Sequence, residues 1–135
     1  LNSSKSHDLK ENPKAAMCFH WKSFNRQIRI LGSVTQVDDK EADLYFDSRS
    51  YESKIGAWAS DQSNSMKERS ELLKKIEDFK KKYKNEKNVP RPPHWSGWCL
   101  RPSSIEFWLH KDNRIHERLR YNNTVNGWEK EILYP

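Results

Sequence analysis

The sequence predicts an α+β fold that is mainly β, with helices inserted between the early and late strands of one antiparallel sheet. Apolar and polar residues alternate near both ends of the chain, in residues 26–37 and 105–121, with the period of two typical of β-strands. Between them, residues 72–83 carry apolar side chains at helical spacing. These observations indicate a sheet, or a small barrel, with a helical insertion at about residues 38–87.

The length of 135 residues suits a single domain, residues 1–135, with a modest core. Only 34% of the residues are hydrophobic, so six Trp, five Tyr and five Phe must supply much of the buried area. The charged fraction of 33% and the mean hydropathy of −1.11 argue against a transmembrane segment. No signal-peptide pattern is present at the start of the sequence.

The net charge of +6 does not by itself indicate a nucleic-acid partner. Residues 67–87 hold nine Lys/Arg and five Asp/Glu, a net charge of +4, on what reads as one solvated helix face. Cys18 and Cys99 lie far apart and outside any C-x-x-C pair, so we interpret them as core residues of a reduced, cytoplasmic protein.

The first third of the chain predicts a helix and two strands. A short helix around Asp8 should end before Pro13, because proline disfavours helix at the residue before it. The apolar run at residues 15–19 and the alternating run at residues 26–37 predict two strands joined through residues 21–25.

The middle of the chain predicts three helices. Asp38 with Glu41 has the spacing of a capping box and opens a helix to about Ser48, and residues 55–59 form a second short helix. After a polar loop at residues 61–64, Ser65 with Glu68 caps the third helix. The apolar stripe of this third helix, which predicts packing, consists of Leu72, Leu73, Ile76, Phe79 and Tyr83.

The last third predicts a rigid connector and four strands. Three prolines make residues 89–93 extended, because proline fixes φ. Strands are expected at residues 95–100, 105–109, 114–121 and 128–133, with a turn-rich loop at residues 122–127. Trp95 and Trp98 are interpreted as core residues.

The alternation in residues 114–121 puts Arg114, His116, Arg118 and Arg120 on one strand face. Same-face residues two positions apart are about 6.6 Å apart, so the first three would form a cationic row about 13 Å long. Such a row suits an anion with several contacts, such as a phosphorylated ring. The alternative is an edge strand whose charged side chains face water, and the pattern alone does not separate the two.

Several blocks of the sequence resemble the pyridoxamine 5'-phosphate oxidase family, and they run in the family's order along the whole chain. The blocks are residues 2–5 (NSSK), 12–13 (NP), 19–21 (FHW), 25–29 (NRQIR), 45–49 (YFDSR), 53–57 (SKIGA), 60–63 (SDQS), 105–108 (IEFW) and 114–118 (RIHER). No single block is specific, but the combination is.

The resemblance implies a fold, a cofactor and an activity. Members of the family form a split β-barrel with an antiparallel, Greek-key-like sheet, and they assemble as homodimers with FMN at the subunit interface. They oxidise pyridoxine or pyridoxamine 5'-phosphate to pyridoxal 5'-phosphate with hydride transfer to flavin N5, and O2 then takes the electrons and becomes H2O2. We therefore expect a flavin-dependent oxidase of vitamin B6 metabolism, with neither nucleic acid nor membrane as a partner.

The resemblance also assigns residues to roles. The family's flavin contacts match Lys5, Gln27, Gln62, Ser63, Trp108 and Arg118. Its substrate-phosphate contacts match Tyr45, Arg49 and Ser53, and arginine suits this role because its planar fork matches phosphate geometry. Arg114 and His116 match residues that bind the substrate ring near the reacting carbon, and we expect them to be the catalytic pair.

The chain departs from the family pattern at several positions. Ser4 stands where arginine is usual, Ser50 where proline is usual and Leu109 where glutamine is common, and residues 132–135 read ILYP instead of RLAP. The family's N-terminal portion, which carries further basic contacts to flavin and a lysine for the substrate phosphate, has no counterpart in residues 1–135. A polypeptide that began at Leu1 is expected to bind flavin weakly and to form an incomplete barrel.

Two other function classes are compatible with the sequence. One is a split-barrel protein that binds flavin or pyridoxal phosphate without turnover. The other is a basic protein that binds single-stranded nucleic acid through exposed aromatic side chains, which is disfavoured because the aromatics occupy strand positions expected to face the core. No metal site is expected, since His20, His94 and His110 lack the spacing of metal ligands.

Overall fold

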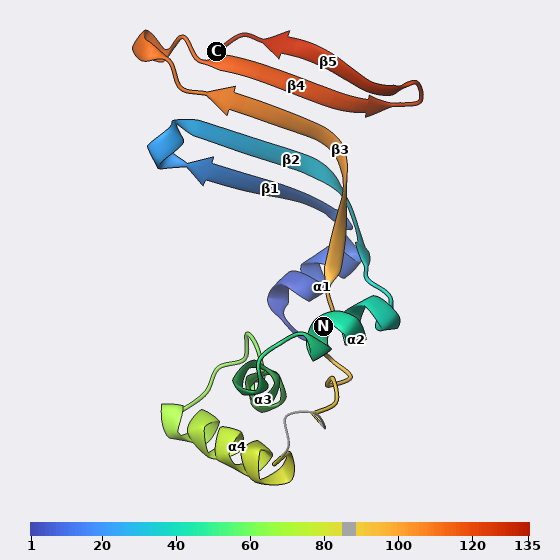
Figure 1. Ribbon diagram of the computed structural model, residues 1–135, viewed down its shortest axis with the longest axis vertical. Coiled ribbons are helices and arrows are strands. Elements are labelled where there is room, and N and C mark those ends of the chain that lie inside the picture. Colours follow the sequence, from blue (N-terminus) through green and yellow to red (C-terminus); the bar gives the residue numbers. More distant parts are fainter. Residues whose placement is uncertain (85–88) are drawn as a thin grey trace. The chain divides into compact units, whose positions relative to one another are not determined.

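The computed structural model describes residues 1–84 and 89–135, which group into two compact units (Figure 1). The helical unit comprises Leu1–Glu11 and Gln36–Trp98, and the sheet unit comprises Asn12–Thr35 and Cys99–Pro135. The helical insertion expected at residues 38–87 lies in the helical unit, except for residues 85–87, which are outside the described residues.

The sheet unit is built around five strands. These are β1 (Lys14–Trp21), β2 (Arg26–Gln36), β3 (Trp98–Leu109), β4 (Glu117–Thr124) and β5 (Gly127–Leu133), and a 3-10 turn, η1 (Lys22–Phe24), joins the first two. The pairs β1–β2, β3–β4 and β4–β5 are antiparallel, as predicted. The spatial order β1-β2-β3-β4-β5 follows the chain, so these five strands form a meander and not the expected Greek-key-like order.

The sheet has one apolar and one polar face, because alternate residues of a strand point to opposite sides. On β1, Met17 and Phe19 lie opposite Ile30 and Ile28 of β2 and share the apolar face with them. On the polar face, Arg29 of β2 reaches Glu106 of β3, with 3.9 Å between Nη1 and Oε2.

The described residues of the helical unit form four α-helices: α1 (Ser4–Glu11), α2 (Asp39–Asp47), α3 (Tyr51–Ala59) and α4 (Arg69–Lys82). The predicted cap of α2 is confirmed, since the Glu41 amide donates to the Asp38 carboxylate over 2.7 Å. The short helix expected at residues 55–59 begins earlier, at Tyr51, because Ser50 caps it by accepting from the Ser53 amide.

The core of the helical unit is aromatic, as the composition predicts. Phe46, Ile55 and Val89 are buried at its centre. The partly buried side chains packed against these three are Tyr51, Ala57, Trp58, Ile76, Phe79, Tyr83 and Trp95. The stripe of α4 thus packs through Ile76, Phe79 and Tyr83, whereas Leu73 was wrongly included, since it is 51% exposed.

Three other expectations about local structure are wrong. The α4 helix begins at Arg69 with Glu68 as its N-cap, so Ser65 does not cap it. The strands expected at residues 95–100 and 105–109 are one continuous strand, β3, which begins at Trp98. Cys18 and Cys99 are exposed and not core residues, and Cys18 lies on β1, a strand at the edge of the sheet.

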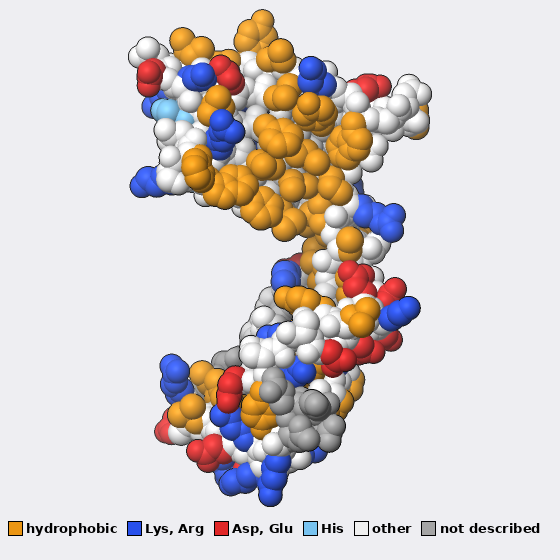
Figure 2. Space-filling model, viewed as in Figure 1, with side chains coloured by type: hydrophobic (Ala, Val, Ile, Leu, Met, Phe, Trp, Pro, Cys, Tyr) orange, Lys and Arg blue, Asp and Glu red, His pale blue; other side chains and the backbone are white. Residues whose placement is uncertain are grey.

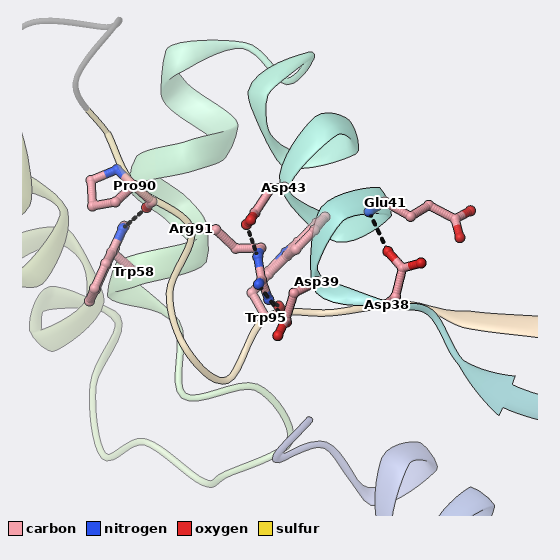
Figure 3. A network of polar contacts seen from close by, with 8 residues as sticks. All are labelled: Asp38, Asp39, Glu41, Asp43, Trp58, Pro90, Arg91 and Trp95. Atoms are coloured by element: carbon pink, nitrogen blue, oxygen red, sulfur yellow. Dashed lines mark hydrogen bonds and ion pairs between the residues drawn. The ribbon is translucent and has the colours of Figure 1, made fainter.

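Hydrogen bonds of Arg91 join the extended connector before β3 to α2 (Figure 3). The Arg91 guanidinium donates to Asp43 over 2.5 Å, to Asp39 over 2.7 Å and to the backbone oxygen of Trp95 over 2.6 Å. These two carboxylates raise the pKa of Arg91 further above its ordinary value through hydrogen bonds. Trp58 adds a hydrogen bond from its indole N–H to the Pro90 oxygen, over 2.8 Å, so the prolines and Arg91 together fix this segment.

The close approach of β2 to β3 generates a stability prediction. A Cβ at Gly32 would lie 2.1 Å from the backbone oxygen of Arg101, so Gly32→Ala must push the strands apart. We expect a loss of about 3 kcal/mol in the free energy of unfolding, measured by urea denaturation.

Gly56 provides the matched control for this prediction. It lies within α3, and a Cβ there would have no atom within 4 Å. Gly56→Ala should therefore stabilise the protein by about 0.5 to 1 kcal/mol through helix propensity. If both variants unfolded at the urea concentration of the wild type, the tight β2–β3 contact would be refuted.

Candidate functional site

The residues that the sequence assigns to a site are divided between the two units. The helical unit carries Lys5, Tyr45, Arg49, Ser53, Gln62 and Ser63, and the sheet unit carries Gln27, Trp108, Arg114, His116 and Arg118.

In the helical unit, four of the predicted residues line one cavity of about 550 Å³: Lys5, Arg49, Ser53 and Gln62. They come from α1, from the link between α2 and α3, from α3 and from the loop after α3. Asp61 also lines the cavity, but Lys75 pairs with its carboxylate over 2.5 Å and lowers its pKa. Lys75 therefore neutralises the charge of Asp61. Lys5 and Arg49 remain in the cavity as positive side chains that can bind an anion.

Arg49 is held at the cavity by an aromatic side chain. Its guanidinium lies 5.1 Å from the centre of the Trp95 ring, within range of a cation–π interaction. The Tyr45 ring stacks on the same indole at 5.9 Å, so Trp95 contacts both predicted phosphate ligands. The sequence reading of Trp95 as a core residue is incomplete, because the residue packs against the core and also lines the cavity.

One nitrogen of Arg49 lacks a partner. Its Nη1 atom is buried and makes no hydrogen bond within the part of the chain that the structure describes. A buried donor without an acceptor is unfavourable by about 1 to 3 kcal/mol, and most native donors avoid this cost. An oxyanion in the cavity would supply the missing acceptor, and a phosphate oxygen fits the guanidinium geometry.

Ser53 and Ser63 also have features that are common in ligand-binding residues. Ser50 donates a hydrogen bond to the Ser53 hydroxyl oxygen over 2.9 Å, which leaves the Ser53 hydroxyl proton free for an acceptor. Ser63 has a φ of 69°, in the left-handed region that residues other than Gly, Asn and Asp seldom adopt. Such backbone strain is common at binding sites, where the fold enforces it.

In the sheet unit, Gln27, Trp108 and Arg118 share the polar face of the sheet. Gln27 and Trp108 lie two residues from Arg29 and Glu106, which meet on that face, and Arg118 lies directly opposite Trp108. A depression of about 500 Å³ borders these three residues, but most of its lining, such as Trp21, Ile28 and Phe107, belongs to the apolar face.

Arg118 is oriented by a buried carboxylate. Its Nε donates to Glu106 over 2.9 Å, and this hydrogen bond raises the pKa of Arg118. Its Nη1 donates to the backbone oxygen of Tyr134 over 3.0 Å. The Glu106 side chain is only 10% exposed, so the ion pair lies in a partly desolvated setting that strengthens it. No local pattern singled out Glu106, which the alternation marks only as a polar strand residue.

The predicted cationic row on one strand is wrong. Arg114 ends a 3-10 turn, η3 (Asp112–Arg114), and β4 begins only at Glu117, so neither Arg114 nor His116 belongs to the strand that carries Arg118. Asn113 and Arg114 have φ values of 54° and 61°, which turn the chain more tightly than the expected polar loop. Alternation could not reveal this turn because its residues happen to continue the period of two.

His116 nevertheless lies close to the predicted flavin contact Trp108. The two rings are 4.7 Å apart, and His110 lies 5.1 Å from His116 and 5.9 Å from Trp108. The Lys111 amide donates to His116 Nδ1 over 3.3 Å, so Nδ1 is the acceptor and Nε2 carries the proton of the neutral ring. The loop therefore presents the Nε2–H group of His116 as a donor.

Two other features are absent from the part of the chain that the structure describes. In residues 1–84 and 89–135, no three His, Cys, Asp or Glu side chains are grouped as ligands for a metal ion. No helix within the same ranges has both the length and the apolar character needed to cross a bilayer.

Comparison with known families gives two matches. A family model described as "Pyridoxamine 5'-phosphate oxidase" matches residues 1–83. A second model, described as "Pyridoxine 5'-phosphate oxidase C-terminal dimerisation region", matches residues 95–135.

Curated relatives match along the whole chain. The pyridoxine/pyridoxamine 5'-phosphate oxidase of Pelagibacter ubique is 60% identical, and that of Sphingopyxis alaskensis 47%, each over 100% of this chain. The chain spans only 65% and 62% of the length of these two relatives. The Zymomonas mobilis enzyme of the same name is 44% identical, again over all of this chain and over 70% of its own length.

Two solved structures confirm the predicted fold class. PhzG from Burkholderia lata 383, in complex with tetrahydrophenazine-1-carboxylic acid, superposes with a TM-score of 0.90 at 30% identity, over 99% of this chain and 65% of PhzG. A pyridoxamine 5'-phosphate oxidase-related, FMN-binding protein from Nostoc punctiforme superposes with a TM-score of 0.72 over 99% of this chain and 68% of its own. At 16% identity, the second likeness concerns the fold alone.

The Glu106–Arg118 pair is expected to stabilise the folded protein. Glu106→Gln removes the charge that holds the Arg118 guanidinium, and we expect the free energy of unfolding to fall by about 2 kcal/mol in urea denaturation. Glu117→Gln is the control, because the Glu117 carboxylate is 66% exposed and pairs with Lys111 at the surface. Its loss should be below about 1 kcal/mol. Equal losses in the two variants would contradict a special role for Glu106.

Proposed function

Because this chain belongs to the pyridoxamine 5'-phosphate oxidase family, we propose that it forms the greater part of an FMN-dependent oxidase of B6 vitamers. The proposed reaction oxidises pyridoxine 5'-phosphate to pyridoxal 5'-phosphate, with O2 as the final electron acceptor and H2O2 as the second product. With pyridoxamine 5'-phosphate, the reaction also consumes water and releases the amine nitrogen as ammonia. The names of the relatives support the activity, and they apply to proteins of which this chain spans about two thirds.

The cavity of the helical unit is the observation that carries the proposal. It gathers Arg49 and Ser53, which match substrate-phosphate contacts, with Lys5 and Gln62, which match flavin contacts. The unpartnered Nη1 of Arg49 is the donor that a phosphate group would satisfy. A substrate phosphate at Arg49 would therefore lie in the same cavity as the side chains assigned to the cofactor.

The residues of the sheet unit fit the assigned cofactor role in their chemistry. Arg118 offers a guanidinium held in place by Glu106, and Trp108 offers an aromatic surface for a planar ring. Gln27 is the third residue assigned to FMN in this unit, and Lys5, Gln62 and Ser63 are the residues assigned to it in the helical unit. When bound, FMN supplies the acceptor for hydride from the C4' carbon of the substrate and the route for electrons to O2.

Arg114 and His116 are proposed to orient the substrate ring. Arg114 is exposed on the loop before β4 and has the strained backbone that a fold maintains at a functional residue. His116 is half-buried against Trp108, and the Lys111 amide fixes its Nε2–H group as a donor to a polar atom of the substrate. Neither side chain is assigned as an obligatory general base.

We also propose that the protein acts as a homodimer. The apolar face of the sheet leaves Met17, Phe19 and Trp21 between 40% and 44% exposed, and Figure 2 shows hydrophobic side chains gathered over the strands of the sheet unit. An exposed apolar patch of this kind is typical of a protein–protein interface. The match to a dimerisation region over residues 95–135 supports the same conclusion. The expectation that the aromatics of these strands face a core is wrong for Phe19 and Trp21.

The activity is tested with the purified protein and pyridoxamine 5'-phosphate. We expect a bound flavin chromophore and H2O2 release on addition of this substrate, with much slower release from unphosphorylated pyridoxamine. A flavin-loaded dimer that releases no H2O2 would identify the alternative, a split-barrel protein that binds flavin or pyridoxal phosphate without turnover.

Arg114→Ala tests the proposed orienting role. We expect kcat to fall on the order of 100-fold, because an oriented charge beside the reacting carbon is lost. The free energy of unfolding should change by less than about 0.5 kcal/mol, since the residue is exposed.

The control for this variant is Arg101→Ala, which removes an exposed arginine from β3. It should leave both kcat and stability unchanged. An Arg114→Ala protein that unfolded more readily but kept its turnover when folded would show that Arg114 has a structural role only.

A further inference from the structure

A second buried polar atom without a partner lies in the same helical unit as Arg49. Among the buried side-chain nitrogen and oxygen atoms of residues 1–84 and 89–135, only Arg49 Nη1 and Ser96 Oγ make no hydrogen bond. Both residues line the cavity of about 550 Å³. Two unsatisfied donors at one cavity indicate a shared acceptor, because native proteins rarely leave such groups unpaired.

The backbone on both sides of Ser96 is fixed. The oxygen of Trp95 accepts a hydrogen bond from Arg91 over 2.6 Å, and the oxygen of Gly97 accepts one from the Val37 amide over 3.1 Å. Figure 3 shows Arg91 between Asp39 and Asp43, the two carboxylates that hold it. Ser96 can therefore change the direction of its hydroxyl only by rotation about χ1, which needs no movement of the backbone.

The position of Ser96 relates it to the predicted phosphate ligands. The preceding residue, Trp95, packs its ring against both the Arg49 guanidinium and the Tyr45 ring. A serine hydroxyl is a neutral donor, so it can bind an anion without adding charge to a cavity that already contains Lys5 and Arg49.

We propose that Ser96 is a further substrate-binding residue, whose hydroxyl donates a hydrogen bond to the phosphate group that Arg49 binds. This inference rests on the proposed function and extends it to a residue that the family resemblance did not assign. It also explains why the segment between the prolines and β3 is held so firmly, since a displaced segment would separate Ser96 from the anion.

The proposal makes a prediction that a packing role for Ser96 would not make. Removal of an unsatisfied buried hydroxyl should not lower stability, because no hydrogen bond within the described residues is lost. Removal of a phosphate ligand should weaken anion binding. Ser96→Ala is therefore expected to lower affinity for a phosphorylated ligand while leaving the melting temperature equal to or above that of the wild type.

The experiment uses 4'-deoxypyridoxine 5'-phosphate, which cannot be oxidised at C4' and has no aldehyde to react with lysines. Its dissociation constant is measured by calorimetric titration of the purified protein, with unphosphorylated 4'-deoxypyridoxine as the second ligand. Ser96→Ala should raise the dissociation constant of the phosphorylated ligand about 10-fold and leave that of the unphosphorylated ligand unchanged. Ser103→Ala, which removes an exposed serine hydroxyl bonded to the Leu31 oxygen, is the control and should alter neither constant.

Arg49→Ala separates the two possible failures. If the wild type bound both ligands equally and Arg49→Ala changed nothing, the proposed phosphate site itself would be refuted, and Ser96 with it. If Arg49→Ala weakened binding of the phosphorylated ligand but Ser96→Ala did not, the site would stand and the role of Ser96 would be overturned. A lower melting temperature of Ser96→Ala with unchanged affinity would likewise show that Ser96 serves packing alone.

Discussion

The helical unit depends on the hydrogen bonds by which Arg91 joins α2 to the connector that leads into β3. A single guanidinium contacts two carboxylates of α2 and one backbone oxygen of the connector, an arrangement that the planar fork of arginine suits and a lysine could not reproduce. Through the Trp95 oxygen, these contacts set the position of the indole that packs against Tyr45 and Arg49. The geometry of the proposed phosphate site thus follows from an ion pair that lies outside it.

The sheet unit depends on the division of its sheet into an apolar face and a polar face. The period of two separates an apolar face, which has the character of a protein interface, from a polar face that carries Gln27, Trp108 and Arg118. Glu106 is the buried charge on the polar face, and it is tolerated because Arg118 and Arg29 lie within ion-pair distance of it. One alternating sequence can therefore supply a surface for association and a surface for a ligand from the same strands.

The sequence was informative wherever a local rule determined the structure. Capping by Asp38, the stops imposed by proline, and the alternation of β2 and β4 were enough to predict most elements and the fold class. The rules failed where a tertiary contact or a turn decided the result. Arg114 and His116 continue an alternating pattern, but Arg114 lies in a tight turn and His116 lies between that turn and β4. Ser65 has cap spacing, but the helix begins at Arg69. No local pattern distinguishes Trp95 or Ser96 as residues at a cavity.

The left-handed backbone at Ser63 and Arg114 bears on attempts to make this protein more heat-resistant. Each residue occupies a conformation that glycine would adopt without strain and that raises the energy of an ordinary L-residue by about 1 kcal/mol. A laboratory screen for thermostable variants would therefore select glycine at these two positions. Under the proposed function they are also where the chain touches flavin and substrate, so the most accessible gains in heat resistance would come at the expense of ligand contacts.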